Sequence, residues 1–168
     1  MTRGVNVVVG TMIFVLLQML VAPRIAIGEI APDFMLLLVA FFAVHRKPER
    51  GAIAGFVVGF IQDLYNPELL GLNALTKSLV GYGVAAVASK SERDNSLLIM
   101  ALIGVAAFVN DFVYLLFFTG LHLGRFFILL VTVSIPSSVY TALIGVAVFK
   151  AAEALGSKAV KSFGKARP

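Results

Sequence analysis

Residues 51–77, GAIAGFVVGFIQDLYNPELLGLNALTK, decide the fold because they combine small residues, an acid and a turn in one run. Four residues follow one another at steps of four: Gly51, Gly55, Gly59 and Asp63. In an α-helix such steps keep the side chains on one slowly drifting side, so these positions form a flat stripe that ends in a carboxylate. A flat stripe of glycines allows another helix to approach closely.

The segment after the Asn66-Pro67 pair carries a second stripe. Proline cannot continue a helix, so this pair ends the first one. Small residues then recur at alternating steps of three and four: Gly71, Ala74, Ser78, Gly81 and Ala85. Two smooth helix faces in tandem predict a tight helical hairpin, packed through these two stripes.

The composition is that of a membrane protein. Apolar residues make up 60% of the 168 residues and charged residues only 14%, whereas soluble domains are nearer to half and a quarter. A chain of this length has room for about six short spans and almost nothing outside the bilayer. The absence of cysteine excludes disulfides, thiolate metal sites and cysteine nucleophiles.

Six apolar stretches predict an all-α, polytopic transmembrane bundle of six short helices. The stretches are residues 4–21, 34–44, 51–65, 72–88, 97–118 and 126–149. The second reaches about 20 Å only if His45 and Arg46 extend its far end. In the sixth, Pro136 predicts a kink whose freed backbone groups are satisfied by neighbouring serine hydroxyls. We expect residues 1–150 to form the transmembrane domain and residues 151–168 a basic cytoplasmic tail.

Basic residues fix the expected orientation. The N-terminus has one Lys or Arg, the second turn three, the fourth turn two and the tail five, whereas the first and fifth turns have one each and the third has none. Because Lys and Arg concentrate in cytoplasmic loops, both termini are expected in the cytoplasm. The same rule accounts for the net charge of +5 without nucleic-acid binding.

Three ionisable residues lie inside the predicted spans, where such residues are costly and usually paired or functional. Counted along their helices, Asp63, Lys77 and Asp111 all come to rest in the outer third of the bilayer. We therefore expect one intramembrane polar cluster, to which three uncharged neighbours contribute hydrogen bonds: Gln62, Asn73 and Asn110.

Two interpretations of this cluster stay open. In the first, Lys77 neutralises one or both carboxylates and locks three helices in register, or Asp63 and Lys77 stay hydrated near the headgroups. In the second, the cluster forms a polar pocket that binds a small substrate or a partner helix.

Little in the sequence supports an enzyme, a metal site or a cofactor. A serine nucleophile needs a histidine base within hydrogen-bond reach, but His45 and His122 are expected at opposite rims of the membrane and residues 134–138 in mid-span. The same separation prevents the two histidines from sharing a metal ion. We therefore predict no catalytic residue, no metal site and no cofactor.

Several short motifs occur in a fixed order in the first half of the chain. They are Pro32-Asp33 at the start of the second span, Gly55-Phe56-x-x-Gly59, Asp63-Leu64 and Leu70-Gly71-Leu72. Together with the length, the six short spans and Asp111 in the fifth span, this order resembles the rod shape-determining protein MreD family.

The resemblance implies a non-enzymatic scaffold subunit of the bacterial cell-elongation (rod) complex, a multi-pass protein of the inner membrane. Its implied partner is the single-span protein MreC and, through it, MreB filaments and the peptidoglycan polymerase and transpeptidase of the elongasome. Such a subunit supports cell shape and peptidoglycan synthesis. We expect lipid-facing parts of the first three spans and the outer turns to contact MreC, while the stripe of residues 51–63 packs internally.

An alternative function comes from a different class. The chain is also similar in size, helix count and shortness of spans to the substrate-binding (S-type) subunits of energy-coupling-factor vitamin transporters. Those subunits need an outward-facing pocket, which a polar cluster in the outer third can line. The outer turns of this chain are short and offer few side chains to close over a ligand, which argues against this alternative.

Overall fold

The computed structural model describes residues 2–44, 46–65, 69–89, 96–120 and 122–155. Over these residues the chain is helical, and its β-structure is limited to an isolated bridge between Ile27 and Ile30. The all-α fold and the six helices predicted from the sequence are confirmed. His45, the Asn66-Pro67 turn, most of the fourth turn and the tail from residue 156 lie outside the described residues.

The six helices include several irregular turns. The elements are α1 (Thr2–Leu16), a π-helical turn (Leu17–Val21), a 3₁₀ turn (Ala22–Arg24), α2 (Phe34–Val44), α3 (Pro48–Asp63), α4 (Leu72–Ala88), α5 (Ser96–Phe118), α6 (Leu123–Leu129), a π-helical turn (Leu130–Ser134) and α7 (Ile135–Leu155). Helix α7 continues to Leu155, past residue 150, and the boundary expected there between transmembrane domain and tail stays a prediction. The apolar pattern ends near residue 149, but good helix formers such as Ala and Glu extend the helix beyond it.

Helix α2 occupies the centre of the bundle. Nine of the eleven residues of α2 are buried, and α2 contributes to all three hydrophobic clusters of the core. It packs against α1, α3, α4, α5 and α7. A helix that is apolar all round has no face suited to water, so it is buried on every side. At about 1.5 Å per residue α2 is about 16 Å long, well short of a hydrocarbon core of about 30 Å.

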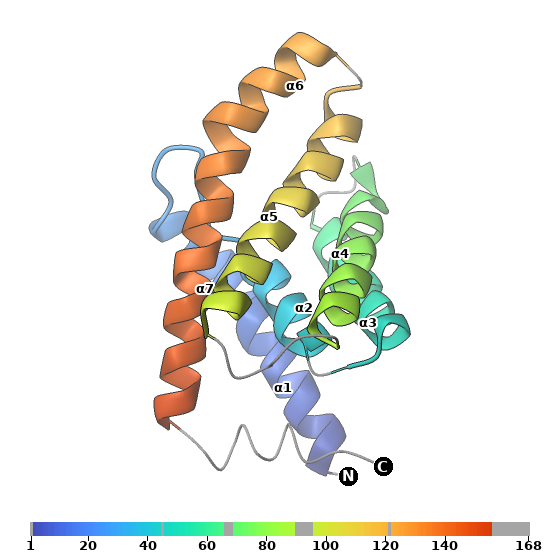
Figure 1. Ribbon diagram of the computed structural model, residues 1–168, viewed down its shortest axis with the longest axis vertical. Helices are drawn as coiled ribbons and strands as arrows, with labels where there is room; N and C mark the ends of the chain where they lie inside the picture. The colour runs from blue at the N-terminus through green and yellow to red at the C-terminus, as the bar shows by residue number, and fades with distance from the viewer. Residues whose placement is uncertain (1, 45, 66–68, 90–95, 121, 156–168) are drawn as a thin grey trace.

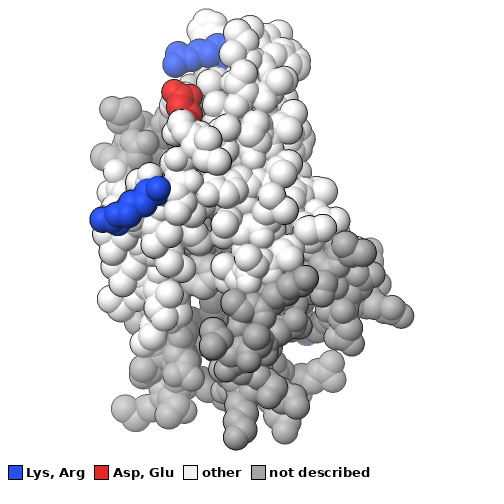
Figure 2. Space-filling view, turned by 90° about the vertical axis from the view of Figure 1, so that its left-hand side faces the viewer, with Lys and Arg blue, Asp and Glu red and all other residues white. Residues whose placement is uncertain are grey.

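Two helices of the described chain are long and apolar enough to cross a membrane, over Met100–Phe118 and Leu123–Val148. Val9–Ile25 and Phe34–Val44 are apolar but shorter. In Figure 1, α5 and α6 rise beyond α2, α3 and α4 at the top of the molecule, whereas α1 begins and α7 ends at the bottom. Figure 2 shows a face whose described part has few charged side chains among uncharged ones, as expected of a lipid-facing surface.

Helices α3 and α4 pack with their backbones in contact. A Cβ atom added at Gly55 would overlap the carbonyl oxygen of Lys77, and one at Gly59 would overlap that of Asn73. At the far end of the same face, a Cβ added at Gly81 would overlap the carbonyl oxygen of Gly51. No side chain larger than hydrogen fits at these positions without moving a helix.

Both π-helical turns end two residues before a proline. The turn Leu17–Val21 precedes Pro23, and the turn Leu130–Ser134 precedes Pro136. Proline removes one helical N–H group and crowds the preceding turn, and a wider turn accommodates both effects. Where the sequence predicted a kink satisfied by serine hydroxyls, the Ser138 hydroxyl donates a hydrogen bond to the Ser134 carbonyl oxygen over 2.7 Å.

Candidate polar site between the helices

The Asp63 carboxylate caps the first turn of α4. It is fully buried and accepts hydrogen bonds from the backbone N–H groups of Gly71 at 2.9 Å and of Asn73 and Ala74 at 3.0 Å. The Asn73 side-chain amide donates a fourth bond, also at 3.0 Å. The residue before α4 is Gly71, which has no side chain to cap the helix, so an acid from the end of α3 satisfies its free N–H groups.

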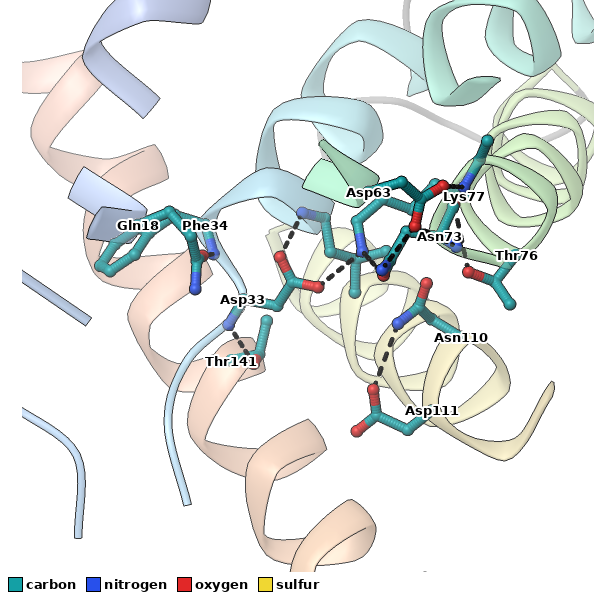
Figure 3. Close-up of polar contacts among 12 residues, drawn as sticks. Gln18, Asp33, Phe34, Asp63, Asn73, Thr76, Lys77, Asn110, Asp111 and Thr141 are labelled. Carbon is teal, nitrogen blue, oxygen red and sulfur yellow. Dashed lines mark hydrogen bonds and ion pairs between the residues drawn. The ribbon is translucent and has the colours of Figure 1, made fainter. Parts of the chain in front are cut away.

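Lys77 links this cap to the start of α2. Its side chain is 0% exposed, and its ammonium group lies 2.9 Å from Oδ2 of Asp33 and 3.5 Å from Oδ1 of Asn73. The Lys77–Asp33 contact takes the place of the expected pairing of Lys77 with Asp63 or Asp111 (Figure 3). Four N–H donors already stabilise the Asp63 carboxylate, so it needs no lysine.

Asp33 joins three helices. Its Oδ1 accepts a bond from the N–H of Leu36 at 2.8 Å, which caps α2, while its own N–H donates to the hydroxyl of Thr141 in α7 at 3.1 Å. The next free N–H group of α2, on Phe34, donates to the Gln18 side-chain oxygen at 2.7 Å. The beginning of the central helix is thus tied to the π-helical turn after α1, to α4 and to α7.

Asp111 makes weaker contacts than Asp63. Its Oδ1 accepts a bond from the Asn110 amide at 3.2 Å, and its Oδ2 lies 3.4 Å from the Ser134 hydroxyl. Asn110 is only 3% exposed, and its own Oδ1 has no hydrogen-bond partner among the described residues. No basic side chain of the described chain forms an ion pair with Asp111, and the ion pair of this region joins Lys77 to Asp33.

A cleft of about 220 Å³ opens beside Asp111, between α5, α7 and the segment before α2. Both Asp33 and Asp111 lie on its wall, and the Asp33 side chain is 21% exposed. Four residues with hydroxyl groups also line the cleft: Tyr114, Ser134, Ser137 and Thr141. The remaining wall is apolar and includes Leu36, Ala107, Leu115 and Val133.

The predicted polar residues therefore fall into two groups. Asp63, Asn73 and Lys77 are connected by hydrogen bonds. Asn110 and Asp111 bond to each other on α5, on the other side of the Lys77–Asp33 pair. Gln62 takes no part in the described hydrogen bonds of either group, and its buried Oε1 has no partner among the described residues.

The two stripes of small residues also differ from the prediction at one position. Ala74, Ser78 and Gly81 lie against the α3 glycines. Gly71 does not, because a Cβ added there would meet nothing within 4 Å. Its φ angle of 96° is in the left-handed region, so glycine at this position serves the turn that presents its N–H to Asp63.

Comparison with protein families gives a match over most of the chain. The family model for rod shape-determining protein MreD covers residues 1–156, nearly the whole chain. The chain belongs to the MreD family. No significant match was found among curated proteins or among solved structures. MreD proteins are shape-determining structural proteins, and membership suggests a role of this chain in the rod-shape complex.

Sequence reasoning on this MreD-family chain missed Asp33 as a member of the polar site. The sequence places Pro32-Asp33 at a helix start and among the motifs of the resemblance, but it does not predict that Asp33 both caps α2 and pairs with Lys77. The available signal was depth, because Asp33 directly precedes α2 and Lys77 lies one to two turns after the start of α4, two helix starts that the sequence predicts on the same side of the membrane. Gln18, Ser134 and Thr141 gave no comparable signal, since their partners depend on how distant helices pack.

Proposed function

We propose that the protein is a non-enzymatic scaffold subunit of the bacterial cell-elongation complex, a multi-pass protein of the inner membrane with both termini in the cytoplasm. The observation that carries the proposal is the MreD family match over residues 1–156. It favours the scaffold over the vitamin-transporter alternative. The placement of the start of α1 and the end of α7 at one end of the molecule agrees with an even number of crossings (Figure 1).

The polar contacts support a structural role for most of the buried charges. Asp63 and Asp33 each cap a helix, and Lys77 is neutralised within the bundle. A protein whose buried charges hold its own helices together presents a rigid body to a partner. These contacts favour a scaffold over a chemical catalyst, because none of the three groups is left free to transfer a proton or to attack a substrate.

The partner in this proposal is a single-span membrane protein of the MreC type, and it docks on the face formed by α1 and α3. The two helices flank α2, and all three share a core cluster that includes Phe14, Met35 and Val58. Their outward sides are rich in large apolar residues: Met12, Ile13, Leu16, Ile53, Phe56, Val57 and Phe60. The glycines of α3 point away from this face toward α4, so they pack internally.

Photocrosslinking tests this docking face. A photoreactive amino acid at Met12 or Phe56 is expected to crosslink to the MreC-type protein in cells. The matched controls are Tyr82 on α4 and Val139 on α7, which are equally exposed but lie on other faces. Strong crosslinks from the controls and none from α1 or α3 would move the interface elsewhere.

Co-purification in mild detergent tests the function class. Recovery of an MreC-type protein with cell-wall synthesis proteins agrees with the scaffold. Recovery of an ATPase-coupled transmembrane subunit, or of a bound vitamin, would contradict it and favour the transporter alternative.

A further inference from the structure

The cleft between α5 and α7 contains a carboxylate, that of Asp111, with no ion-pair partner among the described residues. Asp33 on its wall is neutralised by Lys77. Within the described part of the chain, the Asp111 carboxylate accepts hydrogen bonds only from the Asn110 amide and, at 3.4 Å, from the Ser134 hydroxyl. Asp111 lies within the helix Met100–Phe118, which is long and apolar enough to span a membrane. A lone carboxylate at such a depth is costly unless a proton or a cation neutralises it.

The other polar groups of the cleft are hydroxyls, whose oxygen atoms can accept hydrogen bonds from a cation that carries N–H groups. Tyr114, Ser137 and Thr141, which carry hydroxyl groups, line the same cleft as the two carboxylates, and no Lys or Arg is among the described residues that line it. Its volume of about 220 Å³ is several times the space that one water molecule occupies, so a small organic group fits. Apolar residues, among them Leu115 and Val133, form the rest of the wall.

We propose that this cleft binds a primary ammonium group. Such a group has three N–H donors, which suit the Asp111 carboxylate and the surrounding hydroxyls, and its charge balances that of Asp111. A hard metal ion fits less well, because calcium takes six to eight oxygen ligands and no group of three or more potential metal-binding side chains occurs among the described residues.

Two sources supply this chemistry in a membrane, an aminophospholipid headgroup and a small free amine. The cleft opens between α5, α7 and the segment before α2, and its apolar wall suits the glycerol and acyl carbons next to a headgroup. Either source places its ammonium against the carboxylate of Asp111, which Asn110 orients from behind. The inference is independent of the proposed scaffold function, since partner docking uses α1 and α3.

Native mass spectrometry of the full-length protein in detergent tests the proposal. The probes are phosphatidylethanolamine and phosphatidylcholine with identical acyl chains, because the choline headgroup has the same charge but no N–H donor. We expect the ethanolamine lipid to bind at least about tenfold more tightly, as a charge-assisted hydrogen bond implies. Asp111→Asn is expected to abolish this preference. Glu49→Gln, which removes an exposed charge of α3, is expected to retain it.

A second variant keeps the test valid if Asp111→Asn fails to fold. Ser137→Leu fills the cleft without removing a charge, and it should abolish the preference as well. Its control is Val139→Leu, which enlarges a side chain on the exposed side of α7.

A third probe separates the two sources. If ethylamine raises the unfolding temperature of the wild type but not of Asp111→Asn, while the two lipids bind equally, the ligand is a free amine. Equal binding of both lipids together with no effect of ethylamine would overturn the proposal, since Asp111 would then be neutralised by a proton alone. Occupation of the cleft by a lysine of a co-purified membrane helix would also overturn it.

Discussion

In the α3–α4 hairpin two backbones touch, whereas α5 and α7 leave a cleft of about 220 Å³ between them. Each region contains an aspartate that the sequence predicts to lie within a membrane span. Asp63 in the hairpin accepts four hydrogen bonds of 2.9 to 3.0 Å, and Asp111 beside the cleft has two contacts of 3.2 and 3.4 Å. The difference teaches that a carboxylate inside a membrane protein is structural where helix N–H groups surround it, and available to a ligand where they do not.

We expect the largest effect from a substitution that separates the two helices of the α3–α4 hairpin. Gly55→Leu forces a side chain against the backbone of Lys77, which cannot move without separating α3 from α4. We expect the free energy of unfolding to fall by more than about 3 kcal/mol, enough to prevent folding of a marginally stable protein. Size-exclusion chromatography and the yield of membrane-inserted protein measure this loss.

The matched control for Gly55→Leu is Gly83→Leu. Gly83 lies in α4, and a Cβ added there meets nothing within 4 Å. This variant should fold and elute like the wild type. If both variants lost folded protein to the same extent, the close contact at Gly55 would not be the cause of the loss.

Removing either partner of the ion pair at the start of α2 should reduce stability, but by different amounts. Asp33→Asn leaves the Lys77 ammonium, which is 0% exposed, without a counterion, and we expect a loss of about 3 to 5 kcal/mol. Lys77→Met should cost less, because Asp33 is 21% exposed to the cleft and still caps α2. Thermal unfolding followed by circular dichroism compares the two, and a larger loss for Lys77→Met would refute the assignment.

The double variant Asp33→Asn with Lys77→Met extends this comparison. Once both charges are gone, no charge is left buried without a partner, so the double variant should be more stable than Asp33→Asn alone. Additive losses would mean that the two side chains do not depend on each other.

We expect the smallest effects from alanine substitutions at two glycines, one directly before α4 and one within it. Gly71→Ala places a Cβ on a residue with φ of 96° and should cost about 1 to 2 kcal/mol. Gly83→Ala, in the middle of α4 and facing open space, should instead stabilise by about 0.5 to 1 kcal/mol. The midpoint of chemical unfolding in detergent measures both changes, and the same sign for both would contradict the conformation of Gly71.

The fold was predictable where the information is local. The spacing of Gly51, Gly55 and Gly59 predicted a close helical hairpin, because glycine periodicity acts directly on helix contact. The length of α2 gave no indication of its central position, because eleven residues are few for a membrane span. Only the packing shows that this helix, apolar on every side, lies at the centre of the bundle.

The site was less predictable because it depends on packing between distant segments. The depth of Asp63, Lys77 and Asp111 was deduced from residue counts, but a depth does not identify partners. Lys77 pairs with Asp33, 44 residues away, and the cleft exists because α5 and α7 do not close over Asp111. Neither feature follows from periodicity.

The most direct test of the account compares the two aspartates in the same experiment. Asp63→Asn and Asp111→Asn are unfolded in parallel, in detergent free of primary amines. Asp63→Asn replaces one of the two carboxylate oxygens that accept hydrogen bonds from helix N–H groups with a donor. We predict that the free energy of unfolding falls by about 2 to 3 kcal/mol. Asp111→Asn removes a charge without a counterion and should leave stability unchanged within about 0.5 kcal/mol, or raise it. Equal losses, or a larger loss for Asp111→Asn, would contradict the division into a structural and a ligand-binding carboxylate.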